Sequence, residues 1–298
     1  MRSHRLPAAG EGGIVVFRQT PRPAPEKRSR EVSVHRALAI AGSDCSGGAG
    51  IQADLKTFMA YGVYGMSAVT AVVAENTVGV QAIHELPVPL IVQQIRSCAD
   101  DIGVDAVKIG MLSTAATVAA VAEAIGGGAL PNVVVDPVMV AKSGDSLLSE
   151  AARRSLLEIL LPLARIVTPN RFEAEALTGQ RISTLAQMRE SAARLREAGC
   201  EWVVLKGGHM PALGAAVDIA FDGQEYHELR APLFDTRHTH GTGCTFSSAI
   251  AAGLAKGLPP LAAIQRAKQF ITEAIRSAPG LGHGHGPTNH LAGVSTRW

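Results

Sequence analysis

Beyond residue 35, short apolar runs alternate with stretches of helical periodicity, and this alternation limits the possible folds more than any other feature of the chain. Such runs are typical of strands that are buried on both faces of a sheet. The predicted strands are residues 37–41, 66–73, 106–109, 133–135, 165–167 and 202–205, and the predicted helices between them are residues 51–60, 89–101, 114–125, 149–160, 171–178 and 185–198. This order predicts an α/β fold with a mostly parallel central sheet and helices on both faces.

The last third of the chain adds a hairpin and two helices. Residues 217–221 and 225–229 are joined by Asp222-Gly223, a dipeptide that favours a hairpin, which we place at the edge of the sheet. The two helices are expected at residues 245–256 and 261–277. Because no linker and no internal repeat interrupts the pattern, residues 36–298 are predicted to form a single domain.

Residues 1–35 differ in composition from the rest, being rich in Arg and Pro. We expect a disordered or poorly ordered N-terminal arm. A transit peptide would also be rich in Arg, but Glu11, Glu26, Glu31 and the clustered prolines argue against the amphipathic helix that it needs. A wrongly chosen start codon would give the same appearance, and the sequence leaves these alternatives open.

Composition excludes several classes of protein. The chain is 47% hydrophobic and 18% charged with a formal net charge of +2, so no nucleic-acid-binding surface is indicated. The four cysteines, at positions 45, 98, 200 and 244, lack metal-ligand spacing and are interpreted as free thiols in a reducing compartment. No apolar run approaches the roughly 20 residues that a membrane span needs, so we expect a soluble, cytoplasmic protein.

A glycine-rich turn, Gly241-Thr242-Gly243-Cys244, leads directly into a predicted helix. The unpaired N–H groups and the helix dipole at such a place favour an anion, most often phosphate. The alternative is an ordinary turn capped by Thr242 or Thr245. Cys244 in the first helical turn is predicted to have a lowered thiol pKa, which makes it a candidate base or nucleophile; the alternative is a small buried residue.

Ligands of open α/β sheets bind at the carboxyl ends of the strands, and the loop of residues 42–50 follows the first strand. It is not a Walker A loop, because Lys and Ser/Thr are missing from their positions. Gly48-x-Gly50-x-x-Ala53, with Glu75 downstream, partly matches a dinucleotide fingerprint and leaves an oxidoreductase as an alternative. A third interpretation is a flexible loop that admits a small substrate, with Asp54 nearby on the following helix.

Two further strand ends carry polar residues. Asn170 and Glu173 have the spacing of a helix capping box, and the functional alternative is that Glu173 orders water around a nucleotide-bound magnesium ion. Lys206 ends a predicted buried strand and needs an anionic partner, which a triphosphate would supply. Near the C-terminus, His283, His285 and His290 are interpreted as parts of a glycine-rich closing loop in preference to a metal tract.

Taken in order, these segments resemble the hydroxymethylpyrimidine/phosphomethylpyrimidine kinase family of thiamin biosynthesis, which has the ribokinase-like fold. The resemblance covers residues 37–290. It rests on AGSDCSGGAGIQADLKTF (41–58), ENTVGV (75–80), KIGML (108–112), DPVMVAKSGDSLL (136–148), TPNRFEAEALTG (168–179), LKGGH (205–209), THGTGCT (239–245) and GHGHGP (282–287).

The resemblance implies ATP- and Mg²⁺-dependent phosphorylation of 4-amino-5-hydroxymethyl-2-methylpyrimidine and then of its monophosphate, by a homodimer. It implies that the pyrimidine site is lined by Gly42, Asp54, Glu75, Met111 and Val138. It also implies that Asn170 and Glu173 hold magnesium through water, and that these two residues bind the nucleotide together with Lys206 and Thr242. The charge of the transition state is assigned to the turn of Gly241, Thr242, Gly243 and Cys244.

Two residues depart from the family pattern. Cys45 stands where relatives often have proline, and Glu75 stands where they commonly have glutamine. A glutamine both donates and accepts hydrogen bonds, whereas an ionised glutamate only accepts them. Glu75 therefore leaves a pyridoxal or pyridoxine kinase of the same fold as the main alternative, with a dinucleotide-dependent oxidoreductase and a non-catalytic pyrimidine sensor as remote ones.

Overall fold

The computed structural model describes residues 34–126, 128–139, 149–208 and 214–294. Of the predicted arm, residues 1–33 lie outside this part of the chain, and so do residues 140–148 and His209 of the quoted segments. The division of the chain into an arm and one domain therefore stays a prediction.

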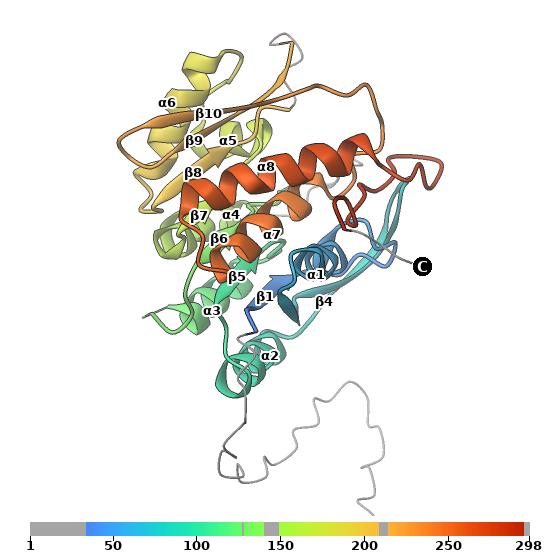
Figure 1. Ribbon diagram of the computed structural model, residues 1–298. Helices are drawn as coiled ribbons and strands as arrows, with labels where there is room; N and C mark the ends of the chain where they lie inside the picture. The colour runs from blue at the N-terminus through green and yellow to red at the C-terminus, as the bar shows by residue number, and fades with distance from the viewer. Residues whose placement is uncertain (1–33, 127, 140–148, 209–213, 295–298) are drawn as a thin grey trace, which may run out of the picture. The chain divides into compact units, whose positions relative to one another are not determined.

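The core of the fold is a sheet of eight strands in the described part of the chain, in the order β10-β9-β8-β7-β6-β5-β1-β2 (Figure 1). The strands are β1 (Arg36–Ala41), β2 (Tyr64–Val69), β5 (Ala106–Ile109), β6 (Val133–Val135), β7 (Ile166–Val167), β8 (Trp202–Leu205), β9 (Ala216–Phe221) and β10 (Tyr226–Ala231). Strands β2, β1, β5, β6, β7 and β8 run parallel to one another. Strand β9 runs antiparallel to β8, and β10 pairs antiparallel with β9 at the sheet edge. The predicted mostly parallel sheet with an edge hairpin is confirmed.

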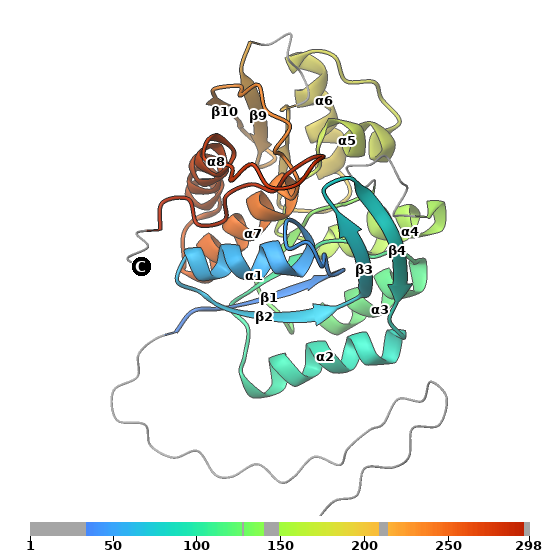
Figure 2. The ribbon, with the colours of Figure 1, turned by 90° about the vertical axis from the view of Figure 1, so that its right-hand side faces the viewer.

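Helices cover both faces of this sheet, as predicted (Figures 1 and 2). One face carries α2 (Val88–Asp101), α3 (Ala115–Ile125), α4 (Glu150–Ser155), α5 (Arg171–Thr178) and α6 (Leu185–Arg196), and the other carries α1 (Gly50–Ala60), α7 (Thr242–Ala255) and α8 (Pro260–Arg276). Strand β1 shows why two cores form. Leu38 and Ile40 pack in the first core, while Ala39 between them packs in the second, because successive side chains of a strand point to opposite faces.

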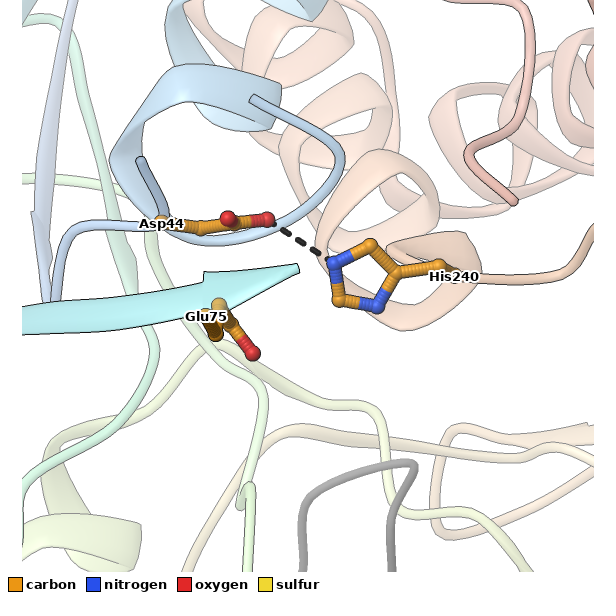
Figure 3. A group of neighbouring side chains, drawn as sticks. All are labelled: Asp44, Glu75 and His240. Atoms are coloured by element: carbon orange, nitrogen blue, oxygen red, sulfur yellow. Dashed lines mark hydrogen bonds and ion pairs between the residues drawn. The ribbon is translucent and has the colours of Figure 1, made fainter. Parts of the chain in front are cut away.

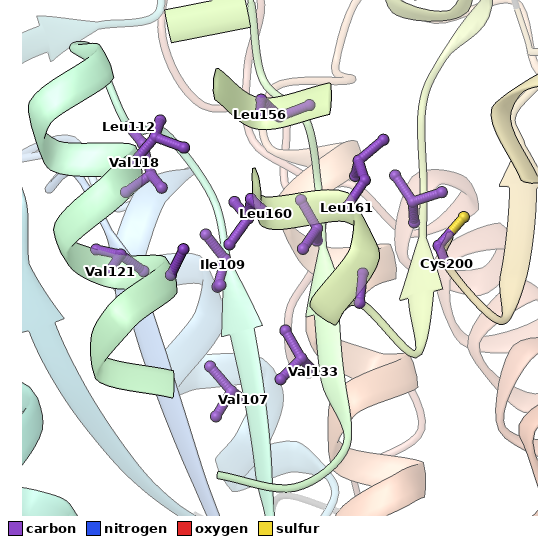
Figure 4. Close-up of a cluster of buried hydrophobic side chains, with 14 of the residues drawn as sticks. Val107, Ile109, Leu112, Val118, Val121, Val133, Leu156, Leu160, Leu161 and Cys200 are labelled. Atoms are coloured by element: carbon purple, nitrogen blue, oxygen red, sulfur yellow. The ribbon is translucent and has the colours of Figure 1, made fainter. Parts of the chain in front are cut away.

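The first core is packed with aliphatic side chains from strands and helices that are distant in sequence. Figure 4 shows Val107 and Ile109 of β5 beside Val118 and Val121 of α3, all of them fully buried. On the other face the small residues of α7 are buried against the sheet and against α8. This packing fixes the N-terminus of α7 beside the carboxyl ends of the parallel strands.

The structure corrects two predicted elements. The single strand expected at residues 66–73 is two strands, β2 and β3 (Ala71–Asn76), because the chain leaves the main sheet at Thr70. Strand β3 pairs with β4 (Gly79–Glu85), which was not predicted, in a separate antiparallel hairpin (Figure 2). The helix expected at 149–160 ends as α4 at Ser155 and continues as a π-helical turn, Leu156–Leu160.

The described residues contain no helix of sufficient length and apolar character to cross a membrane.

Candidate active site

A cavity of 670 Å³ lies at the carboxyl ends of the parallel strands and brings together residues from distant parts of the chain. Of the site residues predicted from sequence, all but Asp54 line it: Gly42, Glu75, Met111, Val138, Asn170, Glu173, Lys206, Gly241, Thr242, Gly243 and Cys244. Other lining residues were assigned no role from the sequence, among them Lys108, Asp136 and Lys268.

The glycine turn begins α7 and forms one wall of the cavity. Gly241 is the N-cap with φ of 74°, and a Cβ atom at this position would lie 1.8 Å from the carbonyl oxygen of Gly48, so only glycine lets these two loops touch. No side chain caps this helix end by a hydrogen bond among the described residues. The alternative of a turn capped by Thr242 or Thr245 is therefore wrong. The Thr242 N–H donates to the Thr239 carbonyl at 3.3 Å and the Thr245 N–H to the Gly241 carbonyl at 2.9 Å, so the N–H groups of Gly243 and Cys244 are the ones placed to bind an anion.

Beneath the turn lies a buried ion pair between Lys206 and Asp136. The Nζ of Lys206 is 2.8 Å from Oδ1 of Asp136, which also accepts a hydrogen bond of 3.0 Å from the Thr168 hydroxyl. A Cβ atom on Gly243 would lie 3.2 Å from Oδ2 of Asp136 and 3.3 Å from Nζ of Lys206. Burial acts to lower the pKa of Lys206, but Asp136 and Glu173 outweigh it and raise that pKa, so the ammonium stays charged.

From sequence, a triphosphate was expected to be the anionic partner of Lys206. In the structure that partner is Asp136. A carboxylate directly after a buried strand was a usable signal for it.

Asn170 and Glu173 form the capping box that the sequence allowed. The Asn170 side chain accepts from the Glu173 N–H at 3.0 Å, and the Glu173 carboxylate accepts from the Asn170 N–H at 2.7 Å. Glu173 is buried, which raises its pKa to about 7; Lys206 opposes this shift and Asp136 adds to it. The two residues therefore have a structural role, and they face the cavity as well.

Asp54 is the predicted site residue that does not line the cavity. It is fully buried, with its two carboxylate oxygens 2.8 and 2.9 Å from Nζ of Lys108, and it accepts a hydrogen bond of 2.7 Å from Ser248. Lys108 does line the cavity, so Asp54 reaches the site through that ammonium. Lys108 was overlooked because it lies within a strand whose other residues are apolar.

The predicted lowering of the Cys244 pKa is wrong. Burial is the largest influence and raises the pKa of the thiol to about 11, although Lys108 acts in the opposite direction and Asp54 and Asp136 add to the rise. The position of Cys244 in the first turn of α7 was inferred correctly. The sequence could not show that removal from water outweighs the favourable place in the helix for this partly buried thiol.

Glu75 lies on the β3–β4 hairpin, close to Asp44 and His240 (Figure 3). One oxygen of Asp44 accepts hydrogen bonds from the N–H groups of Gly48 and Ala49, at 3.0 and 2.6 Å, and is 2.8 Å from Nε2 of His240. The three side chains offer atoms within 4.8 Å of one another, a spacing that could hold a metal ion. Because the Asp44 oxygen already has these three partners, the arrangement is better explained as a joint between two loops.

The charges in this group act on Glu75. Burial, followed by the charge of Asp44, raises the pKa of Glu75 to about 7 against the opposing influence of His240. Burial also acts to raise the pKa of Asp44, but hydrogen bonds from His240 and from backbone groups outweigh it and hold that pKa well below its usual range. Of Asp44 and Glu75, it is therefore Glu75 that binds a proton near neutral pH.

The C-terminal histidines belong to a loop that closes the site. The N–H of His285 donates to the Thr77 carbonyl at 2.7 Å, and the N–H of His240 donates to the Gly286 carbonyl at 3.0 Å. The loop thus connects the β3–β4 hairpin with the glycine turn. Among the described residues, the group with metal-ligand spacing consists of Asp44, Glu75 and His240, and it does not include His283, His285 or His290.

With this geometry, similarity to known proteins becomes informative. A family model described as phosphomethylpyrimidine kinase matches residues 44–289. The chain belongs to the phosphomethylpyrimidine kinase family. Hydroxymethylpyrimidine/phosphomethylpyrimidine kinase from Streptomyces coelicolor is 52% identical over 85% of this chain and 93% of its own length. The corresponding kinase from Bacillus subtilis is 47% identical over 88% of this chain and 96% of its own length.

Solved structures show the same relationship. The ADP complex of Bacillus subtilis pyridoxal kinase superposes with a TM-score of 0.82 at 44% identity and covers 87% of this chain and 98% of that one. The ribokinase-like fold expected of the phosphomethylpyrimidine kinase family is thereby confirmed.

Proposed function

We propose that the protein transfers a phosphoryl group from ATP to 4-amino-5-hydroxymethyl-2-methylpyrimidine and then to its monophosphate, giving the diphosphate used in the pyrimidine branch of thiamin biosynthesis. The observation that carries the proposal is the single cavity, which joins a glycine turn with Lys206 to the pocket around Glu75. Family membership and the names of the similar kinases support the choice of reaction.

Mass spectrometry of the products formed from this pyrimidine with ATP and Mg²⁺ tests the proposal. We expect the monophosphate to appear first and the diphosphate after it. Absence of both products would contradict the proposed function.

The second candidate function is pyridoxal or pyridoxine phosphorylation, which the similarity to Bacillus subtilis pyridoxal kinase favours. Both acceptors are ring alcohols of similar size. Adding them together in one ATP-consumption assay and separating the products measures the preference directly. A larger kcat/KM for pyridoxine would make the pyridoxine kinase the main activity.

The acceptor pocket combines an apolar floor with one titratable group. A Cβ atom on Gly42 would lie 2.5 Å from Cε of Met111, so this glycine leaves room for the Met111 side chain, which lines the cavity together with Val138. A neutral Glu75 can donate to a ring nitrogen and accept from the exocyclic amino group beside it. Glu75 thus takes the place of the glutamine of the family when it carries a proton.

The affinity for the pyrimidine is expected to depend on pH through Glu75. The pKa of about 7 leaves Glu75 mostly neutral below that pH and mostly ionised above it. Because only the neutral form can donate, the KM for the pyrimidine at saturating ATP should rise by about tenfold per pH unit above the pKa. Steady-state kinetics between about pH 6 and 9 measure this slope.

Glu75→Gln is the matched control for this prediction. The amide keeps one donor and one acceptor but does not titrate in this range, so its KM should stay constant with pH. Glu173 has a similar pKa but lies at the nucleotide end, and it is unchanged in both proteins. If Glu75→Gln lowers activity on the pyrimidine while raising it on pyridoxine, the assignment of Glu75 is wrong.

The nucleotide end is assigned to Asn170, Glu173, Lys206 and Thr242, with Mg²⁺ held through water by Glu173 and Asn170. The residues fit this ion: the Glu173 carboxylate is buried with a raised pKa, and a divalent cation beside it would offset the cost of its charge. Bound there, Mg²⁺ would neutralise charge on the nucleotide phosphates.

Phosphoryl transfer then depends on the positions of the reacting groups and on the stabilisation of the phosphate charges. Lys206 neutralises the phosphates of ATP, and the glycine turn of Gly241 to Cys244 stabilises the equatorial oxygens of the transferred group. The N–H groups of Gly243 and Cys244 serve this role best, because the Thr242 N–H donates to the Thr239 carbonyl. Cys244 accepts the proton of the attacking hydroxyl, for which the thiol must first lose its own proton. With a pKa of about 11, that loss needs a nearby cation.

We assign the protein to the cytoplasm as a homodimer, with the β3–β4 hairpin in the interface. Val72, Ala74 and Ala82 are exposed on one face of this hairpin, because Val72 and Ala74 alternate with buried Val73 along β3 and Ala74 pairs with Ala82. Light scattering is expected to give twice the 31.0 kDa mass of the chain. Val72→Asp should shift this mass toward the monomer, whereas Met59→Asp on exposed α1 should not. A monomeric wild-type protein would contradict the assignment.

A further inference from the structure

A second buried ion pair, distinct from that of Lys206 and Asp136, lies beside the acceptor end of the cavity. The side chains of Lys108 and Asp54 are both 0% exposed, and the Lys108 ammonium is within 2.9 Å of each Asp54 oxygen. The pair joins three elements, since Lys108 is on β5, Asp54 is on α1 and the Asp54 partner Ser248 is on α7. A buried ion pair is weak evidence for stability, because removing two charges from water offsets much of their attraction.

The position of the pair relative to Cys244 follows from the helix. Cys244 and Ser248 are four residues apart on α7 and so share one face of it. Ser248 donates to Asp54, and Asp54 holds Lys108, which lines the cavity together with Cys244. The pair therefore lies on the same face of α7 as the thiol.

Four charged side chains act on the thiol from the surrounding elements. They are Lys108, Asp54, Asp136 and Lys206, and the Gly50 backbone N–H also acts on it. Of these groups, Lys108 makes the largest contribution that favours a thiolate. An ammonium has three donors and Asp54 offers it two oxygens, which leaves a third donor for a thiolate.

We propose that Lys108 is the positioning residue for Cys244: its ammonium stabilises the thiolate, and Asp54 holds that ammonium in place. This inference rests on the proposed role of Cys244 as the base. In the transfer step the acceptor hydroxyl loses its proton to Sγ of Cys244 as its oxygen bonds to phosphorus and the bond to the leaving ADP oxygen breaks. Lys108 stays protonated throughout and gives up no proton.

The test is the rate at which iodoacetamide alkylates Cys244 across a pH series, measured in the whole protein by mass spectrometry of the peptide that contains residue 244. Lys108→Met leaves the negative charge of Asp54 near the thiol, so alkylation at a given pH should slow by about tenfold or more. Asp54→Asn leaves the positive charge of Lys108, so alkylation should accelerate by about tenfold. Opposite shifts from the two ends of one ion pair are expected only if their charges act on the thiol.

Two further variants separate charge from folding. Ser248→Ala removes a hydrogen bond to the pair but no charge, so its alkylation profile should match that of the wild type within about threefold. Asp54→Asn with Lys108→Met replaces both charges and avoids an unpaired buried ion. Because Lys108 acts on the thiol more strongly than Asp54 does, alkylation should slow in this double variant too, but less than in Lys108→Met. If the single variants do not fold, a double variant slower than wild type supports the proposal, and one at or above the wild-type rate overturns it.

For folded single variants, shifts in the same direction, or no shift in either, would overturn the proposal. Because alkylation needs neither ATP nor an acceptor, a wrong substrate assignment leaves this test intact.

Discussion

Replacing Lys206 by methionine is expected to lower kcat by about 10²–10³-fold, which is the usual effect of removing one charged or donor group from a transition state. The reason lies in its position, since its ammonium lies beneath the glycine turn and is kept charged by Asp136 and Glu173. Steady-state kinetics with saturating ATP and pyrimidine measure the loss.

Loss of folding must be separated from loss of catalysis, because Lys206→Met leaves Asp136 buried without its cation. Breaking such a pair costs about 3–5 kcal/mol, whereas replacing both partners is often neutral. The double variant Lys206→Met with Asp136→Asn should therefore regain thermal stability and remain inactive. Recovery of activity in the double variant, or a kcat within tenfold of wild type in the single one, would show that Lys206 serves the fold and not the transfer.

Sequence predicted the strands of the main sheet well because each is a short apolar run between helices, and burial on both faces leaves few other interpretations. The prediction of a single strand at residues 66–73 was wrong at Thr70, where the chain leaves one sheet and enters another without a glycine or proline to mark the change. The Thr70 N–H donates to the Ala41 carbonyl at 2.9 Å, and its hydroxyl donates to the Met111 carbonyl at 2.9 Å. Both contacts are long-range, so no local pattern reveals them.

Candidate residues of the site were predicted from strand ends, but their partners were not. Lys206 could be recognised as a lysine that needs an anion, yet the choice between Asp136 and a bound phosphate depends on which strands are neighbours. Lys108 was hidden because a lysine inside an apolar run is buried only when a carboxylate from another element meets it, here Asp54 from α1. The prediction of a lowered pKa for Cys244 was wrong for a related reason, since burial outweighs the favourable place of the thiol in the helix.

Cys244→Ala is expected to lower kcat by about 10²-fold or more, the usual contribution of a general base. The KM for ATP should change little, because the N–H groups of the glycine turn remain. Cys98→Ala is the matched control: Cys98 is also partly buried, but it lies on α2 and does not line the cavity. A near-normal kcat for Cys244→Ala would reduce the thiol to a packing role.

The pH dependence of kcat distinguishes a base from a packing residue more sharply than the size of the loss. With a thiol pKa of about 11, only a small fraction of Cys244 is thiolate at neutral pH. The active form therefore increases as pH rises toward that pKa, and wild-type kcat should rise with pH between about 7 and 9. Cys244→Ala has no group to deprotonate there, so its residual kcat should be flat. Equal slopes in both proteins would mean that another group accepts the proton, and the buried Lys108–Asp54 pair would then need a different explanation.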